Sequence, residues 1–172
     1  MLNYENKTKQ ILTQILRDMD DFAEMKNINY PAIYLLGGSA CILAGYFDRA
    51  TTDFDLLDME YKAEMGRLFR LLDNFDMLDI YLTTIALDFK KRAVKLEEYK
   101  NIYVLAREDI ITAKLARFCE KDIEDIALLL EKTDVKKLVR LIDTVCCRKD
   151  LSERVLNAFK DNVEKFKVMF NV

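Results

Sequence analysis

Histidine is absent from this chain of 172 residues. Its absence excludes a Ser-His-Asp triad, a Cys-His pair and any histidine-ligated zinc site. Catalysis by this chain therefore has to use carboxylates, lysines, hydroxyls and a metal ion. Proline and glycine are also scarce, with one and four residues. So few turn-forming residues argue against a turn-rich all-β fold and in favour of long helices.

Long apolar runs are missing as well, and none approaches the ~20 residues that a membrane span requires. The N-terminus is a charged amphipathic stretch rather than a signal peptide. The four cysteines form no Cys-x-x-Cys motif. We interpret them as free thiols that pack as small hydrophobes in a reducing compartment. The expectation is a cytoplasmic protein with no membrane association.

The charge balance is slightly acidic, and the net charge of −3 provides no general attraction to nucleic acid. An RNA contact would need a local basic patch, and one stretch is dense in basic residues: Lys90, Lys91, Arg92 and Lys95. Such a stretch is suited to RNA backbone or triphosphate. It is equally typical of a solvated helix face.

Hydrophobic periodicity predicts an α+β fold with a composition that changes near residue 107. The hydrophobic share of 51% is sufficient for a core. Predicted strands are 32–36, 53–57, 77–83 and 101–106, and predicted helices are 6–26, 39–47, 61–72, 107–119, 122–132, 134–146 and 151–169. We expect residues 1–106 to form a small mixed β-sheet flanked by helices, including an N-terminal helix. Residues 107–172 would form a helical C-terminal subdomain packed on that core.

The most informative segment is Tyr34-Leu-Leu-Gly-Gly-Ser-Ala40, followed by Arg49-Ala-Thr-Thr-Asp-Phe-Asp-Leu56. On a strand, Asp53 and Asp55 project to one face, while the residues between and after them point to the other. Adjacent carboxylates repel each other unless a cation neutralises them, and magnesium prefers such oxygen ligands. A Gly-Gly-Ser turn at a helix start offers backbone N–H groups to phosphate. Together the two features outline a phosphoryl- or nucleotidyl-transfer site.

This arrangement resembles the minimal nucleotidyltransferase superfamily, whose signature is a Gly-Ser turn, a helix and then Asp-x-Asp on the next strand. The longer pattern is similar to the abortive-infection (AbiEii-like) nucleotidyltransferase toxins and their relatives. Two later segments fit the same group, the stretch from Val104 to Lys114 and the Lys121-Asp122-Ile-Glu-Asp125 helix start. The resemblance covers roughly residues 30–133 and implies a nucleotidyltransferase-like sheet followed by a helical subdomain.

The resemblance also implies roles for individual residues. Gly37, Gly38 and Ser39 would contact phosphate, although Ser39 serves equally well as a helix N-cap. The superfamily needs a third metal-binding acid, for which we choose Asp79, with Asp88 as the runner-up. The predicted catalytic and metal ligands are therefore Asp53, Asp55 and Asp79. Further candidates for triphosphate contact are Arg49 and Lys114. Arg49 could instead pair with Asp53, and Lys114 could instead extend its ammonium group to solvent.

The function implied is a magnesium-dependent nucleotidyltransferase of the toxin-like group. It would transfer a nucleoside monophosphate from a nucleoside triphosphate to an acceptor hydroxyl, with RNA, and tRNA in particular, among the acceptors. A cognate antitoxin is a further expected partner. The alternative is a degenerate, non-catalytic module of the same fold that binds nucleotide or a partner protein. A third acid beside Asp53 and Asp55 distinguishes the two, because only the enzyme needs it.

Overall fold

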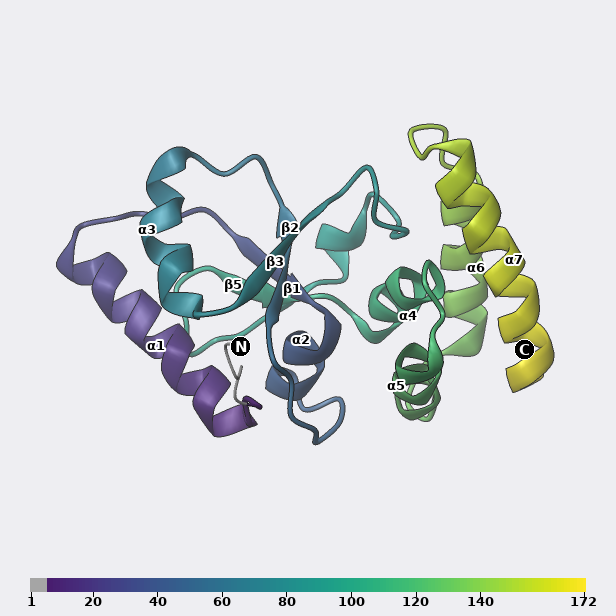
Figure 1. Cartoon of the computed structure of the whole chain (residues 1–172), viewed down its shortest axis with the longest axis horizontal. Coiled ribbons are helices and arrows are strands. Elements are labelled where there is room, and N and C mark those ends of the chain that lie inside the picture. The colour runs from purple at the N-terminus through teal and green to yellow at the C-terminus, as the bar shows by residue number, and fades with distance from the viewer. Residues whose placement is uncertain (1–5) are drawn as a thin grey trace, which may run out of the picture. The chain divides into compact units, whose positions relative to one another are not determined.

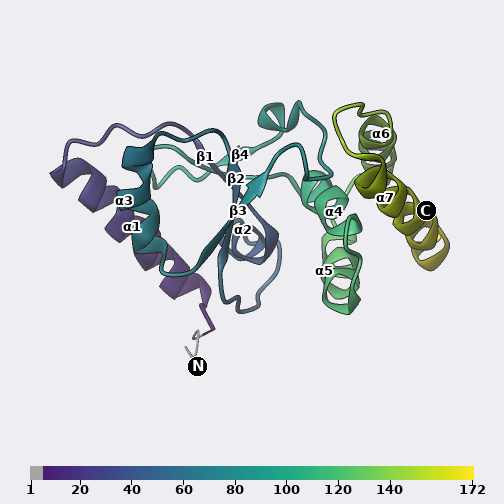
Figure 2. The same ribbon diagram turned by 45° about the horizontal axis from the view of Figure 1, so that its top comes forward.

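A five-stranded mixed sheet organises the first part of the chain (Figures 1 and 2). The computed structural model describes residues 6–172. The strands lie in the order β3-β2-β1-β5-β4. Strand β1 is antiparallel to β2 and parallel to β5, and β4 is antiparallel to β5. Their bounds are β1 Ile33–Leu36, β2 Phe54–Asp58, β3 Phe75–Asp79, β4 Val94–Lys95 and β5 Ile102–Val104.

Helices alternate with the strands in the first part of the chain and make up most of the C-terminal part. The α-helices are α1 Lys9–Met25, α2 Gly37–Leu43, α3 Gly66–Phe69, α4 Arg107–Leu115, α5 Glu120–Leu130, α6 Val135–Cys146 and α7 Glu153–Phe170. Short 3-10 turns are η1 Ala63–Met65, η2 Arg70–Leu72 and η3 Phe89–Lys91. Helices α1 and α3 lie side by side in both views (Figures 1 and 2). The predicted α+β class is confirmed.

The chain divides into two compact units. One contains residues up to Leu78 together with Ala93–Leu105, and the other contains Asp79–Arg92 and Ala106–Val172. The domain boundary that we expected after residue 106 lies within one residue of the point after Leu105 where the chain passes from the first unit to the second. Residues 79–92, however, belong to the second unit and not to the first domain in which we expected them.

The segment after β3 shows why the third predicted strand is displaced. We expected a strand over 77–83, but β3 ends at Asp79. The carbonyl oxygens of Ile80, Thr83 and Ile85 instead accept hydrogen bonds from the buried Arg148 guanidinium, at 3.1, 2.7 and 2.8 Å. A backbone whose carbonyls bind a side chain does not continue a strand ladder.

A classic γ-turn precedes β3 and fixes where that strand begins. Its central residue, Asp73, has φ 67° and ψ −68°, and Asn74 N–H donates to the Leu72 carbonyl at 2.8 Å. This conformation is rare and strained for a residue with a side chain. It reverses the chain directly after η2, so β3 starts at Phe75.

None of the helices between residues 6 and 172 is both long enough and apolar enough to cross a membrane.

Candidate active site

Asp53 and Asp55 lie at the start of β2, as the sequence predicts. Asp53 directly precedes the strand, and Asp55 pairs across the ladder with Leu36, the last residue of β1. Phe54 and Leu56 are fully buried, whereas both aspartates are partly exposed. The period of two along the strand therefore sends two apolar side chains into the core and two carboxylates to an accessible face.

The junction between β1 and α2 brings Gly37, the first residue of α2, into direct contact with the Asp55 carboxylate. Gly37 has φ +70°, and a Cβ atom on it would lie 1.9 Å from Asp55 Oδ2. Both the left-handed backbone and the close approach exclude a side chain here. Gly38 is nearly as confined, because its Cβ would lie 3.0 Å from the Thr51 hydroxyl oxygen. The glycines thus place the backbone of this junction against the acid-bearing strand.

Gly37→Ala should consequently damage the site and lower the free energy of unfolding by about 1–3 kcal/mol. The matched control is Gly66→Ala, since Gly66 lies in α3 with φ −56° and has open space where a Cβ would be. That control should be neutral or stabilising by about 0.4–1 kcal/mol. Urea unfolding of both variants measures the difference. Equal stabilities would contradict the close packing of Gly37 on Asp55.

Ser39 lies deeper than expected. We predicted it at or next to the first helical position, but α2 begins at Gly37 and Ser39 is its third residue. Its side chain is fully buried, and its Oγ makes no hydrogen bond to any residue in the described range. A buried hydroxyl without a partner costs about 1–3 kcal/mol. Solvent does not reach this hydroxyl, so a ligand contacts it only if the structure around it rearranges.

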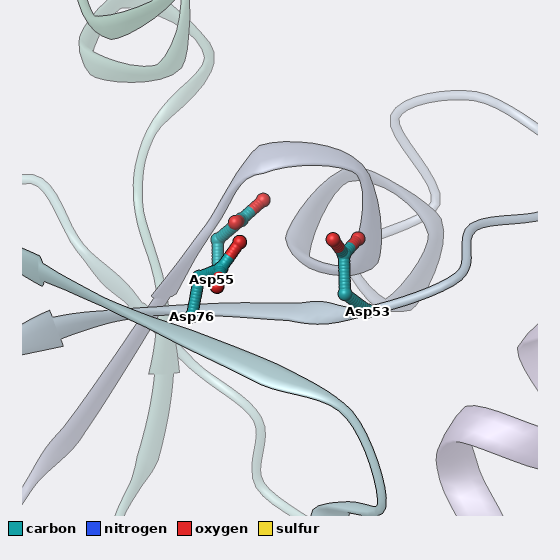
Figure 3. A group of neighbouring side chains, drawn as sticks. All are labelled: Asp53, Asp55 and Asp76. Atoms are coloured by element: carbon teal, nitrogen blue, oxygen red, sulfur yellow. The ribbon is translucent and has the colours of Figure 1, made fainter. Parts of the chain in front are cut away.

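Asp76, on β3, completes a cluster with the predicted pair. One carboxylate oxygen from each of Asp53, Asp55 and Asp76 lies within 4.8 Å of the others. Figure 3 shows the three side chains projecting to the same side of their strands. Within residues 6–172, these three form the one group of acidic, cysteine or histidine side chains arranged closely enough to hold a metal ion.

Asp76, and not the predicted Asp79, is therefore the acid that lies beside the pair. Asp79 is three residues further along β3, so strand alternation turns it to the opposite face. Its Oδ1 accepts the backbone N–H of Tyr81 at 2.8 Å. The runner-up Asp88 is also engaged elsewhere, in an ion pair with Arg92 at 2.8 Å. The guanidinium hydrogen bond lowers the pKa of Asp88 below its ordinary value.

The donor set of this cluster fits a hard divalent cation. Three carboxylates so close together repel one another in the absence of positive charge. Magnesium binds such oxygen ligands, and its charge would remove the repulsion. The acids also differ in access, because Asp53 and Asp55 are partly buried and Asp76 is exposed. One side of the cluster is thus open to solvent.

Arg49 and Lys114, the other candidates for phosphate contact, have protein neighbours of their own. The Arg49 guanidinium lies over the Phe47 ring, 5.8 Å from its centroid. Lys114 Nζ forms ion pairs with the buried Asp125 at 2.8 Å and the buried Asp122 at 3.3 Å.

The Lys-Asp-x-x-Asp segment is therefore part of a charged network in the second unit. Arg117 also pairs with Asp122, at 2.8 Å, and the Cys119 thiol donates to the same carboxylate. Burial opposes the charged form of Asp122, but the hydrogen bonds from Arg117 and Cys119 outweigh it and lower the pKa of Asp122 to about 2. A carboxylate held ionised in this way neutralises Lys114.

The basic stretch at 90–95 does not act as a unit. Arg92 forms a bidentate pair with the buried Asp109, through Nε and Nη2 at 2.8 Å each. Lys95 lies 4.0 Å from Glu97. Arg92 is thus engaged within the protein, which makes it an unsuitable RNA contact.

In this αβ core, strand β1 is followed by a glycine-containing helix start, and aspartates cluster on and beside the neighbouring strands β2 and β3. This combination is typical of a nucleotidyltransferase-type protein. The chain belongs to the family described as "Nucleotidyltransferase of unknown function (DUF6036)", whose model matches residues 10–170. This establishes the superfamily that the sequence motifs indicate. Neither the curated proteins nor the solved structures contain a significant match to the chain.

Proposed function

We propose that this protein is a magnesium-dependent nucleotidyltransferase that transfers a nucleoside monophosphate from a nucleoside triphosphate to an acceptor hydroxyl. The observation that carries the proposal is the convergence of Asp53, Asp55 and Asp76 within 4.8 Å. The convergence occurs beside a glycine turn, in a chain of a nucleotidyltransferase family. Family membership provides the reaction class, and the third acid provides the part that a binding module does not need.

In this proposal the three aspartates hold magnesium, which would neutralise negative charge on the triphosphate and on the reacting phosphoryl group. The partly exposed backbone of Gly37 and Gly38 receives phosphate oxygens on its N–H groups. The acceptor oxygen forms a bond to the α-phosphorus, the bond from that phosphorus to the bridging oxygen breaks, and pyrophosphate leaves. The proton of the acceptor hydroxyl passes to a carboxylate, and Asp76 is our choice because it is the exposed member of the cluster.

Ser39 and Arg49 are proposed as additional phosphate contacts. The buried Ser39 hydroxyl, which has no partner within residues 6–172, would gain a hydrogen bond to phosphate if the structure around it rearranged. Lys114 is a less suitable candidate, because two buried carboxylates already neutralise its ammonium group.

The acceptor and the biological setting follow from the motif resemblance. We propose the toxin-like, AbiEii-like group, a cytoplasmic location and RNA ends, including tRNA, as the first acceptors to test. A cognate antitoxin would be the protein partner. The net charge of −3 favours a small RNA footprint over a large one.

A transfer screen tests the proposal directly. Each of the four α-³²P-labelled triphosphates is incubated with the protein and magnesium, with total RNA and total protein as separate acceptors. Label should enter one acceptor class only when magnesium is present, and Asp53→Asn/Asp55→Asn should give none. Nucleotide binding without transfer to any acceptor would favour the non-catalytic module.

A further inference from the structure

Lys7 joins the N-terminal segment to the residues directly before β2, which lead into Asp53. Its backbone forms an antiparallel bridge with Thr51, with Lys7 N–H donating to the Thr51 carbonyl at 2.6 Å and Thr51 N–H returning a bond at 3.1 Å. Thr51 in turn donates its hydroxyl to Asp53 Oδ1 at 3.4 Å. The main chain of Lys7 therefore adjoins the segment from which Asp53 extends.

The Lys7 side chain makes a second connection, to the strand that carries Asp76. It is 4% exposed, and its Nζ donates to the Thr52 carbonyl at 2.7 Å and pairs with Asp73 Oδ2 at 3.3 Å. A lysine is seldom buried to this degree unless its charge is paired. One ammonium group thus contacts the residue before Asp53 and the centre of the γ-turn before β3.

The two segments also contact each other at this point. Phe54 N–H donates to the Asn74 carbonyl at 3.0 Å, and the Asn74 side-chain amide donates to the Thr52 carbonyl at 3.5 Å. Asp73 maintains a strained conformation that its surroundings have to enforce. The ion pair with Lys7 is a side-chain contact that contributes to this, although the Asp73 side chain is 69% exposed.

From these contacts we infer that Lys7 is a positioning residue for the metal-binding carboxylates. It fixes the start of β2 relative to the start of β3, and so keeps Asp53 and Asp55 close to Asp76. It does not belong to the ligand set itself. This inference rests on the proposed function, since the cluster matters only if it binds a metal.

The experiment measures the affinity of the full chain for Mn²⁺ by electron paramagnetic resonance, without nucleotide. Lys7→Met removes the ammonium group and keeps most of the side-chain volume. Lys7→Gln keeps a donor for the Thr52 carbonyl but no charge for Asp73. The matched control is Arg148→Met, which removes another buried cation that binds backbone carbonyls, in the second unit. Urea unfolding is recorded for every variant.

We expect Lys7→Met to weaken Mn²⁺ binding about tenfold, the effect typical of outer-shell partners of a metal site. The direction of the change in Mn²⁺ affinity is informative, because removing a nearby positive charge would by itself strengthen binding of a cation. Lys7→Gln should fall between Lys7→Met and the natural protein. Arg148→Met should lose stability and keep its Mn²⁺ affinity.

Wild-type affinity in Lys7→Met, or an equal loss in Arg148→Met, would overturn the inference while leaving the proposed function intact. Should Lys7→Met show no cooperative unfolding, the affinity of Lys7→Gln decides by the same criterion. Absence of Mn²⁺ binding by the natural protein would instead contradict the proposed metal site and the inference with it.

Discussion

Asp76→Asn is expected to reduce nucleotide transfer by on the order of 10²–10³, equivalent to about 3–4 kcal/mol of transition-state stabilisation. The variant removes one of three carboxylates whose oxygens lie within 4.8 Å of one another. The KM for the triphosphate should change less than threefold or so, because the backbone at Gly37 and Gly38 is untouched. Steady-state kinetics with the acceptor identified in the transfer screen measures both quantities.

The matched control for this prediction is Asp79→Asn. It makes the same chemical change on the same strand, at an exposed position that faces away from Asp76. We expect it to transfer nucleotide at the rate of the natural protein. A full loss in Asp79→Asn with normal transfer in Asp76→Asn would reverse the assignment of the third acid.

The same two variants should also differ in stability without metal, because only one of them relieves repulsion between neighbouring carboxylates. Without metal, Asp76→Asn should be slightly more stable than the natural protein, because one of three neighbouring negative charges is removed. Asp79→Asn lacks that neighbourhood and should show no such gain. Thermal unfolding in EDTA compares the two.

The aspartate pair and the glycine turn were predictable because their geometry is local. Strand β1, the short helix α2 that begins directly after it at Gly37, and strand β2 follow one another between residues 33 and 58. Alternation on β2 then decides which side Asp53 and Asp55 face. The details differ, because Ser39 is the buried third residue of α2 and β2 begins at Phe54, one residue later than predicted.

Asp76 was missed because the start of β3 depends on a turn without glycine or proline. Asp76 and Asp79 are three apart, so any register that presents one hides the other. The signal was the Asp73-Asn74 dipeptide after a helical stretch, a pair of residues that favours turns. Beginning the strand at Phe75 would have made Asp76 its second residue, as Asp55 is in β2.

Lys7 and Arg148 had no sequence signal at all. Each is a buried cation whose side chain binds groups 45 or more residues away, except for the local pair of Arg148 with Asp150. Periodicity identifies which faces of an element are apolar, but it does not identify which distant backbone carbonyls will accept a hydrogen bond from a side chain. Such contacts are settled only when the tertiary structure brings the segments together.

Arg92→Leu is expected to lower the free energy of unfolding by about 3–5 kcal/mol at pH 7. The substitution leaves the Asp109 carboxylate, which is fully buried, without the bidentate partner that binds both its oxygens at 2.8 Å. The other partner, Asp88, is half exposed and would be solvated. Urea unfolding followed by circular dichroism measures the loss. The solvent-accessible pair of the partly exposed Lys167 with the exposed Glu164 provides the control, and Lys167→Leu should change stability by about 0.5 kcal/mol or less.

The pH dependence of this loss identifies its cause. Burial raises the pKa of Asp109, and Arg92 opposes that rise. In Arg92→Leu the opposition is gone, so the folded-state pKa of Asp109 increases further. A raised pKa of the folded state stabilises the protein below the unfolded pKa, and this contribution is lost as pH rises through the folded pKa. The loss in free energy of unfolding should therefore be largest near neutral pH and shrink as the solution is acidified.

Arg92→Leu/Asp109→Leu should recover most of this lost stability at pH 7, because an apolar pair leaves no unpaired charge. A deficit independent of pH, with no recovery in the double variant, would mean that lost packing of the arginine, not the buried carboxylate, destabilises the second unit.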